Sequence, residues 1–249
     1  MHSIIERNSN MIGLGTIVNT AVVLAGGGIG LLLKKGIGES LQTALTKAIG
    51  VAVILVGVSG VLQEMLTVDN GSLSSHGTIM LIISLVAGTL FGELLKIEQR
   101  LENLGDRIKK LMKSGGSRFT EGFVTNTLVI CVGAMAIVGS LNDGLHGDPT
   151  MLFAKSILDG VIAVVFASTM GVGVLFAAIP MFIYQGGITL LAGLLSDVLS
   201  AAMISNLSCV GSALILVIGL NMALGAKIKT GNMLPALIVP IIWTLLAGA

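Results

Sequence analysis

The sequence predicts an all-α membrane protein: a polytopic bundle of about eight transmembrane helices, with seven as the alternative count. Of the 249 residues, 54% are hydrophobic and only 11% are charged, whereas a soluble domain carries about 25% charged residues. The mean hydropathy is +0.98, and apolar segments long enough to cross about 30 Å of hydrocarbon recur along the chain. In lipid, such segments form helices, because a helix pairs the backbone N–H and C=O groups within the segment. These figures exclude a soluble globule, a disordered chain, a secreted disulfide scaffold and a nucleic-acid binder.

The chain divides into a short tail and one membrane domain. We expect residues 1–10 to be a disordered tail and residues 11–249 to form a single transmembrane domain. The apolar segments run at about 12–33, 41–62, 78–95, 123–141, 150–171, 174–195, 201–224 and 233–246. The fifth and sixth segments are separated by the turn residues Gly171, Gly173 and Pro180. Without a turn there, the two segments merge and seven spans remain.

The basic residues predict the topology. Most of them lie in three connecting segments, at 34–35, 96–121 and 227–229, whereas loops 63–77 and 142–149 contain no lysine or arginine. The positive-inside rule then places the basic loops in the cytoplasm and both termini outside. Apolar residues recur with a helical period within 96–121. This linker is therefore an amphipathic helix that lies either on the inner leaflet or against the ends of the bundle.

Two blocks of the sequence recur at nearly one offset, which predicts an internal repeat. A shift of 107 residues places Asn19-Thr20 on Asn126-Thr127, and a shift of 108 places Lys47 on Lys155. An odd number of spans separates the copies, so they have opposite orientations, as in many secondary transporters. The resulting division is repeat one at about 12–95, the cytoplasmic linker at 96–121, repeat two at about 122–195, and two further spans at 201–246.

The segment from Asn142 to Asp159 carries the strongest candidate chemistry. Asp148 followed by Pro149 predicts a helix start, with a capping carboxylate and a proline at the first helical position. Counted from that cap, Asp159 lies about 16 Å along the helix, at mid-bilayer depth. Lys155 lies four residues before it on the same face. Because a charge at that depth costs at least about 2.5 kcal/mol, the pair either fixes helix packing or is opened by a substrate or a proton in a wet cavity.

Other polar residues in the spans complete the candidate site. The asparagine–threonine pairs are either interhelical hydrogen-bonding groups or symmetry-related ligands, and Lys47 is either a snorkelling lysine or a substrate ligand. The candidate residues for an ion or small solute are Asp159, Lys155, Asn19, Asn126, Thr20, Thr127 and Lys47. The helix-cap and loop residues are Asn142, Asp143, Asp148 and Pro149. Cys131 and Cys209 lie in apolar runs as buried thiols, and no motif indicates a metal, a cofactor or an enzyme.

Three stretches resemble one protein family. They are MIGLGTIVNTAVVLAGGGIG near the start, GDPTMLFAKSILD, and GNMLPAL before the last span. Together they resemble the bacterial inner-membrane family of YqgA and YdfK, domain of unknown function 554, over nearly the whole chain after residue 10. The resemblance implies a polytopic cytoplasmic-membrane protein and brings no substrate or activity.

The expected function follows from the residues. We expect a homodimeric secondary transporter of a small ion or small polar or anionic solute, working by alternating access around a midplane site. One alternative is an ion channel that uses the same polar residues. The other is a structural or assembly protein that transports nothing. Its expected partners are the lipid bilayer, the solute and a second copy of the chain.

Overall fold

The structure, a computed structural model, describes residues 11–34, 38–69, 71–111, 118–131, 134–195 and 199–247. The predicted tail at 1–10 lies outside these residues. The long helices are α1 (Leu14–Lys34), α2 (Glu39–Met65), α3 (Thr78–Leu95), α7 (Thr150–Met170) and α11 (Ala201–Leu224). The shorter helices are α4 (Ile97–Leu111), α5 (Phe119–Cys131), α6 (Ala134–His146), α8 (Gly173–Phe176), α9 (Ala178–Leu190), α10 (Ala192–Leu195) and α12 (Ile238–Ala247). A 3-10 helix, η1 (Thr230–Leu237), precedes α12, and strands β1 (Leu66–Asp69) and β2 (Ser72–Ser75) form an antiparallel hairpin.

The predicted all-α membrane bundle is confirmed, with fewer full spans than expected. Within the described ranges, six helices are long and apolar enough to cross a membrane, the sixth being the run Gly173–Leu190 formed by α8 and α9. Helices α5 and α6 form a pair bent by 61°, and counting that pair as one span raises the number to seven. The fifth and sixth predicted segments are indeed separate, because α7 ends at Gly171, whose φ is 90°.

Two predicted segments differ from single spans for identifiable reasons. The segment at 123–141 consists of α5 and α6, and α6 continues to His146, so Asn142 and Asp143 are helical rather than in a loop. The last segment begins as the 3-10 helix η1, which contains Pro235. Proline has no backbone N–H and disfavours the α conformation in the preceding residue. The apolar helical run Thr230–Leu246 is consequently shorter than a full span.

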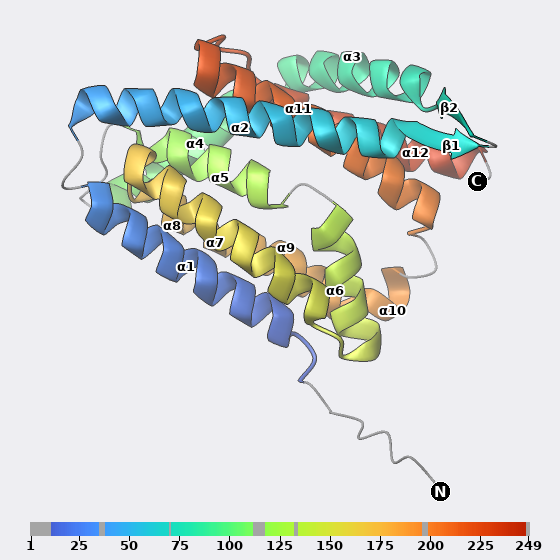
Figure 1. Cartoon of the computed structure of the whole chain (residues 1–249), viewed down its shortest axis with the longest axis horizontal. Coiled ribbons are helices and arrows are strands. Elements are labelled where there is room, and N and C mark those ends of the chain that lie inside the picture. Colours follow the sequence, from blue (N-terminus) through green and yellow to red (C-terminus); the bar gives the residue numbers. More distant parts are fainter. Residues whose placement is uncertain are drawn as a thin grey trace, which may run out of the picture.

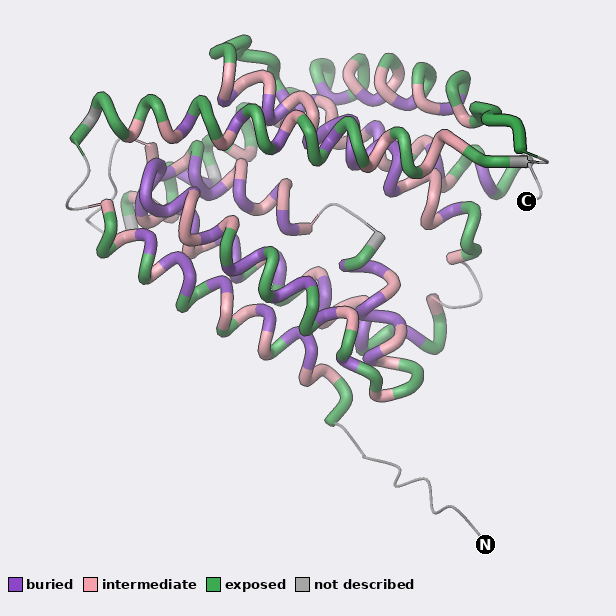
Figure 2. The backbone as a smooth tube through the Cα atoms, in the orientation of Figure 1, coloured by how far each residue is buried: buried purple, intermediate pink, exposed green. Residues whose placement is uncertain are grey.

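The helices form two groups joined by close backbone contacts. Figure 1 shows α2, α3, α11 and α12 in one group and α1, α6, α7 and α9 in the other. The most extensive contacts join α1 to α7 and α2 to α11. Gly26 of α1 lies against the carbonyl of Gly160, and Gly57 of α2 lies against the backbone of Leu216. Small residues thus bring the helix axes close together. Exposed residues cover the outer faces of α2 and α3, whereas α7 and α11 are largely buried (Figure 2).

The basic segments meet at one end of the bundle, which we call the basic end. Arg118, just before α5, lies close to Lys34 at the end of α1 and donates a hydrogen bond to Thr46 Oγ1 in α2. Lys229, before η1, pairs with Glu93 of α3 at 3.3 Å. Helix α2 runs from this end to the β1–β2 hairpin at the other (Figure 1). This is the grouping of loops that the charge pattern predicts.

Helix α4 docks across the basic end. The Glu98 carboxylate accepts a hydrogen bond from the Gly231 N–H, and the Glu98 N–H donates to Asn232 Oδ1 at 2.7 Å. Near the other end of α4, Asp106 accepts from the Thr120 hydroxyl at 3.0 Å. Of the two placements expected for this amphipathic helix, these contacts agree with docking against the bundle.

The inverted repeat stays a prediction. Helix α1 ends at the basic end and α5 begins there, so these equivalent helices run in opposite directions, as the repeat requires. The packing of the two copies differs, however. Helix α1 lies along α7, whereas α2, the counterpart of α7, lies along α11.

Candidate functional site

The predicted charge pair lies on the buried face of α7. Residues 152, 155, 156, 159, 160 and 163 are buried, and 153, 154, 157, 158 and 161 are exposed, as expected for a helix with one lipid-facing side. The Lys155 Nζ lies 2.7 Å from both Asp159 carboxylate oxygens. Only 7% of Lys155 and 3% of Asp159 is exposed. The pair is therefore a desolvated, hydrogen-bonded ion pair midway along α7.

Two amides from other helices complete this site. Asn19 of α1 donates through Nδ2 to Asp159 Oδ2 at 2.9 Å and to Gln185 Oε1 of α9 at 3.2 Å. Both amide side chains are fully buried. We call Lys155, Asp159, Asn19 and Gln185 the α7 charge cluster. Its hydrogen bonds join α1, α7 and α9 through side chains alone. These hydrogen bonds can therefore lengthen or break when the helices move relative to one another.

Several polar atoms near the cluster have no hydrogen-bond partner. Among the described residues, the buried unpaired atoms include Asn19 Oδ1, Gln185 Nε2 and Thr16 Oγ1. Thr16 lies one turn before Asn19 on α1, and its methyl group faces Gly186, next to Gln185. Native structures leave few buried polar groups unpaired, and each one calls for an explanation such as a bound ion or water. The cluster therefore has unused capacity to bind a polar ligand.

A broken helix lies beside the cluster. Helix α5 ends at Cys131, which is within electrostatic range of both Lys155 and Asp159. Helix α6 then continues from Ala134 at 61° to α5. Helix ends expose carbonyl and N–H groups that have no partner within the helix. Discontinuous helices of this kind form the binding sites of many secondary transporters.

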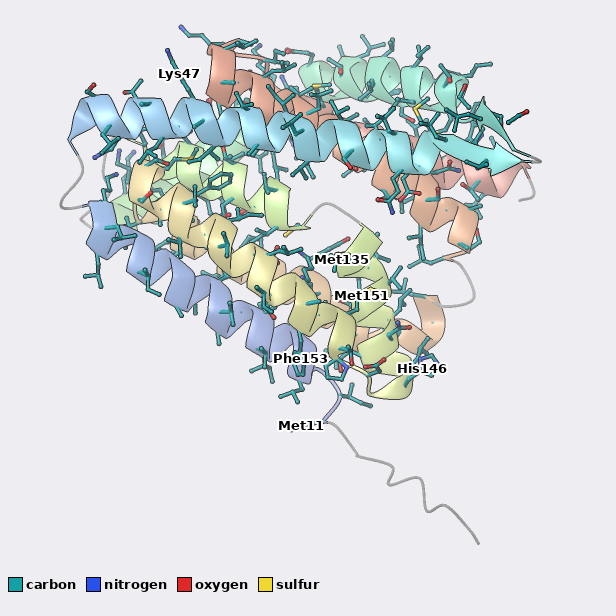
Figure 3. The ribbon with its side chains drawn as sticks, viewed as in Figure 1. Met11, Lys47, Met135, His146, Met151 and Phe153 are labelled. Carbon is teal, nitrogen blue, oxygen red and sulfur yellow. The ribbon has the colours of Figure 1, made fainter. Side chains whose placement is uncertain are left out.

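Four predicted site residues lie outside the cluster. Asn126 donates through Nδ2 to the Val174 carbonyl at 3.0 Å, and its Oδ1 is unpaired and buried. Thr20 and Thr127 each donate to the carbonyl four residues earlier, at 2.8 and 2.7 Å. Lys47 is exposed on α2 and points away from α7 (Figure 3). The structure brings Asn19 to the charge pair but does not bring its repeat counterpart Asn126 there.

The predicted caps act at two different helix starts. The Asp143 carboxylate, fully buried, accepts hydrogen bonds from Gly13 N–H at 3.2 Å and Gly15 N–H at 3.0 Å, so it caps α1 from α6. Asp148 accepts from the Thr150 N–H at 3.0 Å. Hydrogen bonding to Thr150 holds the pKa of this carboxyl below its usual value.

The start of α7 differs slightly from the prediction. The helix begins at Thr150, so Pro149 is its cap residue rather than its first helical residue. The Asn142 carbonyl accepts a hydrogen bond from the Asp148 N–H at 3.3 Å, which ties the end of α6 to this start. Figure 3 shows Met151 and Phe153 at the start of α7, near His146 at the end of α6.

The open cavities lie at the basic end. One, of about 400 Å³, is bordered by α4, α5, α11 and η1, and its deepest residue along α5 is Leu128. Another, of about 680 Å³, is bordered by the ends of α3 and α11 and by the basic loop before η1. Neither cavity is lined by Lys155 or Asp159. The charge pair, for which the sequence leaves open a wet cavity or a packing role, is buried and lies outside these two cavities in this conformation.

One residue of the cluster, Gln185, is absent from the sequence prediction. The only available signal was a polar side chain inside the apolar run of α9, with no repeat partner and no charge to single it out. Its role follows from the hydrogen bond to Asn19, a contact between helices far apart in the chain.

Comparisons with known proteins agree with this architecture. Residues 14–245 match the model of the family described as "Protein of unknown function (DUF554)". The chain is 35% identical over 226 residues to "Uncharacterized membrane protein YdfK" of Bacillus subtilis (strain 168), a match that covers 91% of this chain and 93% of that protein. It is 28% identical over 231 residues to "Uncharacterized protein YqgA" of Escherichia coli (strain K12), covering 91% and 94%. No solved structure matches.

Proposed function

Because the chain belongs to the DUF554 family and is a membrane protein, we propose that it moves a small ion or small polar solute across the bilayer, with the α7 charge cluster as its binding site. One observation carries the proposal. A complete ion pair is buried midway along a membrane helix, next to polar atoms that have no partner. Ionisable residues at this depth are expensive and usually functional.

The mechanism we propose is competition for the ion pair. A cation would compete with the Lys155 ammonium for the Asp159 carboxylate, and an anionic group would compete with Asp159 for Lys155. Either exchange would weaken one contact that joins α7 to α1 through Asn19. Ligand binding would thereby alter how the two helices pack, which is the coupling that alternating access requires.

The closed state of the pair is compatible with this mechanism. An alternating-access carrier passes through conformations in which the bound site opens to neither side. The bend between α5 and α6 lies next to the pair and would provide the moving element. We further propose that the basic end faces the cytoplasm, in accordance with the positive-inside rule.

The test is substitution of Asp159 in protein reconstituted into liposomes. Asp159→Asn keeps the size and the hydrogen bond to Asn19 but removes the charge. We expect solute flux to fall to background, while Asp159→Glu keeps a measurable rate. Size-exclusion profile and thermal unfolding in detergent establish that both variants are folded. Full flux by folded Asp159→Asn would contradict the proposal, and non-saturating wild-type flux would indicate a channel instead.

A structural role is the second candidate, and the near-complete burial of the pair favours it. Breaking a buried ion pair by removing one partner destabilises a protein even when the pair has no other function. If the cluster only locks helices together, Asp159→Asn should lower the unfolding temperature, and the wild-type protein should transport none of the solutes offered.

A further inference from the structure

The face of α4 that borders the 400 Å³ cavity is acidic. Glu98, Glu102 and Asp106 are spaced at i, i+4 and i+8, so they form one stripe on the helix, and all three line the cavity. Glu121 of α5 also lines the cavity, but its carboxylate is paired with Arg118 at 2.7 Å. Lys109 is the one basic residue among the lining residues. Burial, together with the nearby charge of Glu102, raises the pKa of Glu98. Like charges at this spacing are unfavourable for the helix itself.

This cavity leads toward the α7 charge cluster. Val124 and Leu128 of α5 line it, and Cys131 follows at the same helical spacing on that side of α5. Cys131 is within electrostatic range of Lys155 and Asp159. Leu128 is packed into the main hydrophobic core with Ile218 of α11. Leu128 and Cys131, about one helical turn apart on α5, thus lie on the side of the cavity that faces the cluster.

The cluster itself has unused oxygen atoms. Asn19 Oδ1 and Thr16 Oγ1 are unpaired, each on a side chain at most 1% exposed, and both lie on the same side of α1 as the hydrogen bond to Asp159. Carboxylate, amide and hydroxyl oxygens are the ligands that hard cations prefer. The unpaired Gln185 Nε2 is a donor and would suit an anion instead, but the α4 carboxylates that line this cavity would repel an anion that entered through it.

Accepting the transport function proposed above, we propose that the transported species is a small monovalent metal cation, which reaches the cluster from the basic end through this acidic cavity. The carboxylates of α4 concentrate the cation at the entrance. Leu128 and its neighbours form the barrier between cavity and cluster. The Lys155 ammonium pairs with the Asp159 carboxylate when no metal cation is bound there.

The experiment measures tracer uptake into proteoliposomes, with ²²Na⁺ and ⁸⁶Rb⁺ as cation probes and ³⁶Cl⁻ and ¹⁴C-acetate as anion probes. We expect saturable uptake of at least one cation, which Asp159→Asn abolishes. The double variant Glu102→Gln/Asp106→Asn should lower the initial uptake rate at low ionic strength by about tenfold. The reason is that a negatively charged cleft raises the local cation concentration and so the rate at which cations bind. The wild-type rate should fall as salt is added, and the variant's rate should change little.

Two further variants keep the test decisive. Lys109→Gln removes the basic residue from the cavity and should raise the cation rate. Asp148→Asn removes one negative charge at the exposed start of α7, far from α4, and still provides a helix cap, so its rate should equal that of the wild type. If folded Glu102→Gln/Asp106→Asn keeps the wild-type uptake rate and salt dependence, the proposal that cations enter through the acidic cavity is overturned. Uptake of an anion that depends on Asp159, without cation uptake, would overturn the cation assignment and leave the transport proposal standing. Absence of any Asp159-dependent flux would overturn both.

Discussion

The α1–α7 and α2–α11 helix pairs are packed by the same device but differ in what they bury. In both, glycines allow the backbones to touch, as at Gly26 on Gly160 and Gly57 on Leu216. Among the described residues, the polar contacts of the two pairs differ. Asn19 of α1 donates to Asp159 of the buried ion pair on α7, whereas Glu64 of α2 accepts a hydrogen bond from the Ser205 hydroxyl of α11 at 2.6 Å. The described parts of α2 and α11 thus pack closely without a buried ion pair. Close packing of two long helices in this protein therefore does not require buried charges such as those on α7, which is why we assign them a function.

The largest effect should come from breaking the charge pair. Asp159→Ala leaves the Lys155 ammonium buried without its partner, and removal of one partner from a buried pair typically destabilises by about 3–5 kcal/mol. Denaturant unfolding in detergent micelles measures this change, with Asp148→Ala at the exposed start of α7 as the comparison. A loss no greater than that of Asp148→Ala would mean that the pair is already hydrated, contrary to its burial.

An intermediate effect is expected from the glycine contacts, and it should be similar in both helix pairs. An added Cβ at Gly26 or Gly57 would meet the backbone of the facing helix, so each alanine substitution should destabilise by about 1–3 kcal/mol. Gly28 of α1 has open space around it, and Gly28→Ala should be neutral or slightly stabilising because alanine is the better helix former. Thermal unfolding of the three variants checks this order. Equal stabilities would contradict the close contacts.

The smallest effect is expected at Lys47, the repeat counterpart of Lys155. Lys47 is exposed on α2, so Lys47→Gln should change the unfolding free energy by no more than about 0.5 kcal/mol and leave flux at the wild-type level. Lys155→Gln should impair both. Unfolding and uptake measured side by side for the two lysine variants test this contrast. Equal losses would mean that the two lysines are functionally equivalent, as the repeat alone suggests.

The sequence predicts what depends on local patterns and misses what depends on contacts between distant segments. Residue spacing places Lys155 and Asp159 on one face of α7, and the Asp148-Pro149 cap locates the helix start to within one residue. Asn19 was a candidate because it is polar within an apolar run, yet nothing local indicates that it bonds to Asp159, 140 residues away. Gln185 was missed for the same reason.

The differences in the spans also have physical causes. The 123–141 segment is long and mostly apolar, so hydropathy averaged along it cannot reveal the bend between α5 and α6. Asp143 is polar and close to a turn, which favours a loop, but its carboxylate caps α1 from within α6. In the last segment, Pro235 was visible in the sequence, and it accompanies the 3-10 helix that shortens the final apolar run.

The most direct test of the central claim separates function from packing in a single protein. The double variant Lys155→Met/Asp159→Leu replaces the buried pair by apolar side chains of similar size, a change that is often neutral or stabilising in protein interiors. The account predicts a protein at least as stable as the wild type in thermal unfolding, with uptake of ²²Na⁺ and ⁸⁶Rb⁺ no faster than that of protein-free liposomes. Wild-type rates of uptake by this folded double variant would contradict it.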